Sequence, residues 1–184
     1  MRLQVQVAPL KRGERPRRWY DPGRIRRVAA LTVTPEGVVG HDGDRAVVDV
    51  HHRDHPQSRH RGDNGISLCT TGHYERMREE FGDHLVDGIA AENVLLDRPG
   101  WLDVEQLAAG VAVVGEDGER GRLVLGRPAA AEPCVEFSRL AVGDPDAPLQ
   151  EPLRQLRGGV RGYYLSVLAG AGTRLREGDR IVAC

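Results

Sequence analysis

Cysteine is the residue of this sequence with the most direct chemistry, because a thiolate is both a nucleophile and a ligand for soft metals. Cys69, Cys134 and Cys184 are an odd number, with no close pair and no C-x-x-C motif. This spacing argues against a disulfide framework and a zinc ribbon. Cys69 lies in an apolar run and is expected in the core, and Cys184 is expected to be frayed. Cys134 follows Pro133, which stiffens the backbone, and is either a buried structural thiol or the functional one; we favour the latter.

Arginines flank this cysteine and a later segment. Arg127 and Arg139 lie on either side of Cys134, and Arg161 precedes a predicted strand. Guanidinium groups bind phosphate through two parallel hydrogen bonds and can stabilise a nearby thiolate. The alternative for each is a surface salt bridge, because the protein is rich in arginine and Lys11 is its only lysine.

A histidine cluster lies among aspartates in residues 49–63 and consists of His51, His52, His55 and His60. Imidazole and carboxylate groups are ligands of zinc and iron. The segment contains Pro56 and lacks a regular helical spacing, so it is a poor rigid support for a metal. We expect a polar loop that lines or covers a pocket, with His52 as a candidate binding residue; a metal site is the alternative.

Several protein classes are disfavoured. The sequence has no P-loop, dinucleotide-binding, zincin or serine-hydrolase motif. The net charge of -1 supplies no overall field that would attract nucleic acid or a membrane surface.

The charge is unevenly distributed along the chain: residues 1–27 carry a net charge of +7, which leaves -8 on the rest. We expect residues 1–27 to form a solvated arm. The alternative is that they contribute to binding an anionic ligand or a nucleic-acid backbone. No membrane span or secretory signal is visible, so a cytoplasmic protein with reduced thiols is expected.

The elements that must position these residues are mostly short strands. The length of 184 residues favours one domain, here residues 24–184, preceded by a Pro- and Arg-rich basic extension, residues 1–23. Val, Ile and turn patterns predict strands at 25–33, 45–50, 66–68, 92–96, 111–114, 122–125, 135–137, 162–168 and 180–183. Asp117-Gly118 predicts a hairpin turn. Helical spacing predicts one helix from residue 70 or 71 to 81 and turns at 103–107 and 153–156. The sequence therefore predicts a mainly β, barrel-like domain with a few short helices, α+β by count.

The order of segments resembles the MOSC domain, the module found at the carboxyl end of molybdenum cofactor sulfurases and in small stand-alone bacterial proteins. Ala91-Glu92-Asn93-Val94 is similar to the family's Gly-Glu-Asn-Leu element, and Pro133-Cys134 to its Pro-Cys element. Arg161-Gly162-Tyr163-Tyr164 and the later Gly178-Asp179 are similar to its closing strands. The resemblance covers roughly residues 24–183. One departure is that residues 51–56 replace the His-Gly-Gly-Pro element of many stand-alone members.

This resemblance implies a β-barrel-like fold and a molybdenum cofactor (molybdopterin), with Cys134 as the molybdenum ligand or a persulfide carrier. The residues expected to bind the cofactor are Ser67, His52, Glu92, Asn93, Arg127, Arg139 and Arg161. The implied activities are reduction of N-hydroxylated or N-oxide substrates, with an electron-donor protein, or carriage of sulfur from a cysteine desulfurase; neither involves nucleic acid or a membrane. The alternatives are a non-catalytic module that binds a small anion or a partner protein, and a hydrolase or oxygenase built on the histidines. Glu92, Asn93 and Cys134 are expected around one pocket, because strand ends meet at one mouth of a closed sheet.

Overall fold

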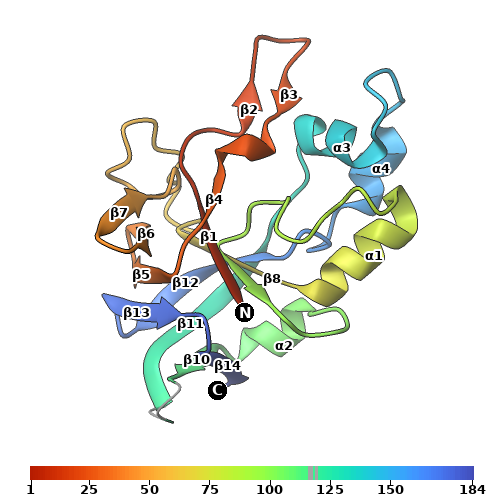
Figure 1. The fold of residues 1–184 in the computed structure, drawn as a ribbon. Helices are drawn as coiled ribbons and strands as arrows, with labels where there is room; N and C mark the ends of the chain where they lie inside the picture. Colours follow the sequence, from red (N-terminus) through yellow and green to blue (C-terminus); the bar gives the residue numbers. More distant parts are fainter. Residues whose placement is uncertain (116–117, 119) are drawn as a thin grey trace.

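An eight-stranded mixed sheet runs through the centre of the molecule (Figure 1). The computed structural model describes residues 1–115, 118 and 120–184. Across the sheet the strand order is β14-β10-β11-β12-β8-β9-β1-β4. The strands are β1 (Arg2–Gln6), β4 (Ile25–Arg27), β8 (Ile66–Thr70), β9 (Val94–Leu96), β10 (Val111–Val114), β11 (Arg120–Ala130), β12 (Tyr163–Ala169) and β14 (Arg180–Ala183). Strands β8 and β9 are parallel, and the other neighbours are antiparallel.

A second sheet has the order β13-β5-β6-β7. Its strands are β5 (Ala30–Thr34), β6 (Gly37–Asp42), β7 (Arg45–Val48) and β13 (Thr173–Arg176). The mainly β prediction is confirmed, with 35% strand and 18% helix. The closed barrel is not formed in the described residues, and the strand predicted at 25–33 explains why. It divides into β4 and β5, which join different sheets, so β4 ends the large sheet as an edge.

Four α-helices lie among the described residues: α1 (Thr71–Phe81), α2 (Val104–Ala108), α3 (Val135–Val142) and α4 (Gln150–Gln155). The helix predicted up to residue 81 is confirmed and ends at Gly82. The turn predicted at 103–107 is also confirmed, and Asp103 and Gln106 form a capping box at its start. The extended segment predicted at 135–137 is wrong, because these residues form the first turn of α3. Phe137 and Ala141, one helical turn apart, are fully buried, and this packing outweighs the β propensity of the segment.

The amino-terminal residues are integrated into the fold, in contrast to the expected extension over residues 1–23. Strand β1 pairs with β9 and β4, and Leu3 and Val5 are buried in the core. After a 3-10 turn at Pro22–Arg24 the chain enters β4. Between β1 and this turn, β2 (Lys11–Arg12) and β3 (Trp19–Tyr20) form a small hairpin. The hairpin stands away from the two sheets, at the top of Figure 1.

The remaining predictions concern hairpins near the carboxyl end. Strands β10 and β11 pair antiparallel as predicted, while Asp117 of the predicted turn lies outside the described residues. The predicted glycine-rich turn between 168 and 180 instead contains β13, which pairs with β5 of the second sheet. Among the described residues no helix is both long enough and apolar enough to cross a membrane.

Candidate functional site

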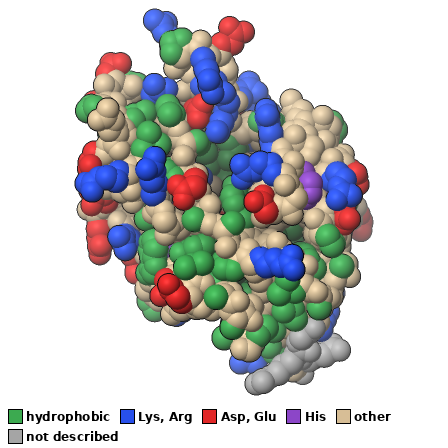
Figure 2. All heavy atoms as spheres, turned by 180° about the vertical axis from the view of Figure 1, so that it is seen from behind, with side chains coloured by type: hydrophobic (Ala, Val, Ile, Leu, Met, Phe, Trp, Pro, Cys, Tyr) green, Lys and Arg blue, Asp and Glu red, His purple; other side chains and the backbone are tan. Residues whose placement is uncertain are grey.

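The main cavity of the structure has a volume of about 520 Å³, within the ~300–1,000 Å³ typical of small-molecule sites. It is bordered by segments far apart in the sequence: residues 6–20, 50–67, 90–92, 130–134 and 161–164. The charged side chains around it are Lys11, Arg18, Arg59, Arg61, Arg161, Glu92 and Glu132. Basic groups outnumber acidic ones by five to two, so the cavity favours an anionic ligand. In Figure 2, which shows the molecule from behind relative to Figure 1, many Lys and Arg side chains lie over the upper part of the visible face.

The basic groups differ in how far they are already neutralised. Lys11 and Arg18 form ion pairs with the Glu136 carboxylate, at 3.7 and 3.4 Å. In the part of the chain that the structure describes, Arg59 and Arg61 form no ion pair within 4 Å. These two guanidinium groups are therefore the cavity's most available partners for a phosphate.

Cys134 lies at the N-terminus of α3 and borders the cavity half-buried. Its Sγ accepts a hydrogen bond from the backbone N–H of Phe137, 3.5 Å away. The sulfur therefore lies at the positive end of the helix dipole. The sequence predicted a strand end here, but β11 already stops at Ala130, and Cys134 is a helix N-cap.

Arg161 joins the two motifs that the sequence singled out. Its guanidinium donates to the carbonyl oxygen of Glu132, at 3.3 Å, and to that of Ala90, at 3.2 Å. It also lies over the ring of Phe137, 4.0 Å from the centroid. These contacts hold the Cys134 segment beside the Glu92 segment at the cavity.

Glu92 borders the cavity with only 3% of its surface exposed. The hydroxyl of Tyr74 donates to Glu92 Oε2 at 2.8 Å, and the same hydroxyl accepts from the backbone N–H of Ala90 at 3.0 Å. Glu92 Oε1 has no hydrogen-bond partner among the residues that the structure describes. Desolvation by burial raises the pKa of Glu92 to about 7. The preceding Ala91 has a φ of 67°, a region that favours glycine, which is the residue at this position in the family element that the segment resembles.

Asn93 lies one layer behind the cavity. Its Oδ1 accepts from the backbone N–H and the hydroxyl of Ser67, both at 3.0 Å, and Ser67 itself borders the cavity. Its Nδ2 donates to the carbonyl oxygen of Gln4 at 3.3 Å and to Asp49 Oδ2 at 3.1 Å. Glu92 and Cys134 thus meet at one cavity, and Asn93 supports its wall.

Three predicted binding residues lie elsewhere. His52 is buried away from the cavity, where its Nδ1 accepts from the backbone N–H of Asp54 at 3.1 Å. Arg127 borders a second, smaller cavity of about 180 Å³. Arg139 donates to backbone carbonyl oxygens of Pro16 and Arg18 and so attaches the β2–β3 hairpin to α3. Neither Arg127 nor Arg139 is among the residues that line the main cavity, although both lie within seven residues of Cys134 in the sequence.

The loop over residues 49–63 lines the cavity as predicted, through His51, Arg59 and Arg61 and not through His52. Sequence reasoning did not single out these two arginines, and it missed Lys11, Arg18 and Tyr164. The available signals were the basic charge of residues 1–27 and the arginines beside the histidine cluster. No group of three or more His, Cys, Asp or Glu side chains that could hold a metal ion occurs among the described residues.

Comparison with known proteins shows a similarity in fold to two solved structures. No family model and no curated protein matches the chain. The crystal structure of the YUAD protein from Bacillus subtilis is similar, with a TM-score of 0.56 and 15% identity over 98% of this chain and 96% of that one. The crystal structure of a hypothetical protein has a TM-score of 0.54 and 13% identity over 100% of this chain and 66% of that one. Fold and site together define a mainly β protein with a basic cavity, which among the described residues is bordered by one thiol, that of Cys134.

Proposed function

We propose that this chain is a MOSC-type protein that binds the molybdenum cofactor (molybdopterin) in the main cavity and reduces N-hydroxylated substrates. The observation that carries the proposal is the position of Cys134. It is the one cysteine of the described residues that borders the cavity: Cys69 is fully buried in the core and Cys184 is exposed.

The side chains present fit such a cofactor. A thiolate is a ligand that soft metals accept, and Cys134 supplies one. Arg59 and Arg61 supply free guanidinium groups for the pterin phosphate, and the volume of about 520 Å³ suits a ligand of this size. When bound, the cofactor supplies two-electron redox chemistry, and the protein's own groups bind it and provide protons.

Reduction is favoured over sulfur carriage because proton-exchanging side chains border the same cavity as the thiol. Cleavage of the N–O bond in R–NH–OH to give R–NH2 and water consumes two electrons and two protons. The electrons come from an external donor, for which we propose a redox protein. Glu92 and His51 both border the cavity, and carboxyl and imidazole groups are common acid–base catalysts. We place this activity in the cytoplasm, where the thiols of Cys69, Cys134 and Cys184 stay reduced.

The test is reconstitution of the purified chain with molybdenum cofactor, followed by metal analysis. Wild type and Cys184→Ser are expected to retain molybdenum in near-equal amount to the protein, whereas Cys134→Ser retains almost none. Serine is a good N-cap, so Cys134→Ser keeps α3 and the fold, which circular dichroism checks. A wild type without molybdenum, or a Cys134→Ser variant that keeps it, would refute the proposal.

The loaded protein is then supplied with benzamidoxime and a reduced viologen dye, and benzamidine is measured by chromatography. We expect benzamidine from wild type and Cys184→Ser only. If no benzamidine forms and mass spectrometry instead finds one added sulfur atom on Cys134 after incubation with a cysteine desulfurase, the chain is a sulfur carrier and not a reductase.

A further inference from the structure

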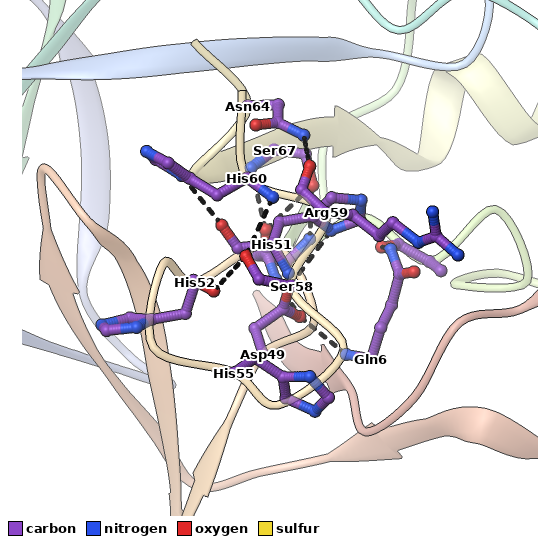
Figure 3. A network of polar contacts seen from close by, with 12 residues as sticks. Gln6, Asp49, His51, His52, His55, Ser58, Arg59, His60, Asn64 and Ser67 are labelled. Carbon is purple, nitrogen blue, oxygen red and sulfur yellow. Dashed lines mark hydrogen bonds and ion pairs between the residues drawn. The ribbon is translucent and has the colours of Figure 1, made fainter. Parts of the chain in front are cut away.

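The loop between β7 and β8 presents a histidine–aspartate pair at the wall of the main cavity. His51 Nδ1 lies 3.2 Å from Asp49 Oδ1, and His51 borders the cavity. Figure 3 shows the pair at the centre of a network of polar contacts. Such a pair is the arrangement by which enzymes orient an imidazole for proton transfer.

Asp49 is held by donors alone. It is fully buried and accepts from the backbone N–H of Gln6, at 2.7 Å, and of His51, at 2.8 Å. The side-chain amide of Asn93 donates to its Oδ2 at 3.1 Å. These bonds fix the carboxylate as an acceptor, so the facing His51 Nδ1 carries the proton. In the neutral ring the lone pair is then on Nε2.

Two further residues, Tyr164 and His60, contact His51, one at its ring and one at its backbone. The ring of Tyr164 lies on β12 with its centroid 6.4 Å from that of His51, and His60 Nδ1 contacts the carbonyl oxygen of His51 at 3.0 Å. Among the contacts of the described residues, His51 Nε2 has no partner. The imidazole is therefore held on its Nδ1 side, while its Nε2 is available to a ligand.

The side chains of His52 and His55, in the same loop, form hydrogen bonds with backbone groups. His55 accepts from the N–H of Gln57 and contacts the carbonyl oxygen of Val7, and His52 accepts from the N–H of Asp54. Neither borders the cavity. His51 alone among them combines a buried carboxylate partner with a position in the cavity wall.

We propose that His51 is the acid–base residue of the cavity, delivering a proton from Nε2 to the substrate oxygen, and that Asp49 and Asn93 are positioning residues. The inference rests on the proposed function in that the substrate is the N-hydroxylated compound bound there. With both ring nitrogens protonated, His51 transfers the Nε2 proton to the oxygen that leaves nitrogen as water, and the second proton, taken up by the nitrogen, comes from solvent. The external donor supplies both electrons, and solvent returns the proton to His51.

This role also explains why Asn93 lies behind the cavity. Its Nδ2 bridges to Asp49 and its Oδ1 to Ser67, so the segment that contains Glu92 is connected directly to the histidine pair. The titratable groups in contact with His51 are Asp49 and His60 of its own loop and Tyr164 of β12. The charged groups that border the same cavity are Lys11, Arg18, Arg59, Arg61, Arg161, Glu92 and Glu132.

The first test needs neither cofactor nor activity. Nitrogen-15 NMR of the imidazoles in the whole chain is expected to show His51 as the Nδ1–H tautomer, with its signal assigned by loss in His51→Gln. In Asp49→Asn the amide can donate, so this tautomer preference is expected to be lost while the His55 signals stay unchanged. An Nε2–H tautomer of His51 in the wild type would overturn the inference.

The second test compares kinetics of the reconstituted protein. A positioned acid–base group contributes ~100- to 10,000-fold to a rate, so His51→Gln is expected to lower kcat for benzamidoxime about 100-fold, with KM and molybdenum content unchanged. His55→Gln, in the same loop but outside the cavity wall, is the matched control and is expected to keep the wild-type rate. Molybdenum bound with an unchanged rate in His51→Gln overturns this inference alone, whereas wild type without molybdenum overturns the proposed function.

Discussion

Replacing Glu92 by glutamine removes a carboxyl group that the fold buries beside the cavity. In the wild type, burial raises the pKa of Glu92 from 4.5 to about 7. Because this pKa is higher in the folded state than in the unfolded state, the unfolded chain loses its proton first as pH rises. The stability associated with the protonated carboxyl is therefore fully present below about pH 4.5 and is lost as pH rises to about 7.

The magnitude follows from the size of the shift. Each pKa unit corresponds to 1.36 kcal/mol, so the shift from 4.5 to about 7 corresponds to about 3 kcal/mol. Glutamine does not titrate, and its carbonyl oxygen can still accept the Tyr74 hydroxyl. The stability of Glu92→Gln relative to wild type is therefore expected to rise with pH: its free energy of unfolding, compared with that of the wild type, increases by about 2.5 kcal/mol between about pH 5 and about pH 8.

The assay is urea unfolding of both proteins, followed by circular dichroism at these two pH values. Glu105→Gln, an exposed position on α2, is the matched control and is expected to show a far smaller change. A difference between Glu92→Gln and wild type that does not vary with pH would refute the argument that burial keeps this carboxyl protonated.

Two further predictions concern backbone conformation. Gly162→Ala is expected to destabilise the fold by at least about 2 kcal/mol in thermal unfolding, because Gly162 has a φ of 84° and a Cβ there would lie 2.3 Å from the carbonyl oxygen of Leu68. Gly172→Ala has a similar φ of 85° and open space, so an equal loss in both variants would contradict the steric reasoning. Arg127→Gly is expected to stabilise the protein by up to about 1 kcal/mol, because Arg127 has a φ of 53°; lower stability in urea unfolding would count against it.

Local sequence signals predicted the elements that depend on local physics. The helix ending at Gly82 and the cap at Asp103 both follow from residues within a few positions of each other. Helix α3 did not follow, since Phe137 is buried against Tyr20, whose ring centroid lies 5.3 Å away. That contact joins segments more than one hundred residues apart, and no local pattern contains it.

The residues of the candidate site also fall into those that local sequence motifs predicted and those that only the packing of the fold brings to the cavity. Cys134 and Glu92 were found because their sequence motifs are compact, and both border the cavity. Arg59 and Arg61 were missed because nothing local distinguishes them from other arginines. Arg127 was chosen for its closeness to Cys134, yet it borders the other cavity. Which arginines face a ligand depends on how the sheets and loops pack, which arginine spacing does not encode.

The position of β1 has a consequence for how the chain is made. Leu3 pairs with Val94, so the first strand leaves the ribosome about 90 residues before its partner on β9. At ~5–20 residues per second, the edge of β1 that pairs with β9 remains without its partner for several seconds or more during translation. During that interval β1 can hydrogen-bond with β4 or with another nascent chain. Slow translation of the segment up to β9 is therefore expected to increase misassembly, and synthesis at a reduced elongation rate, with recovery of soluble protein as the readout, measures it.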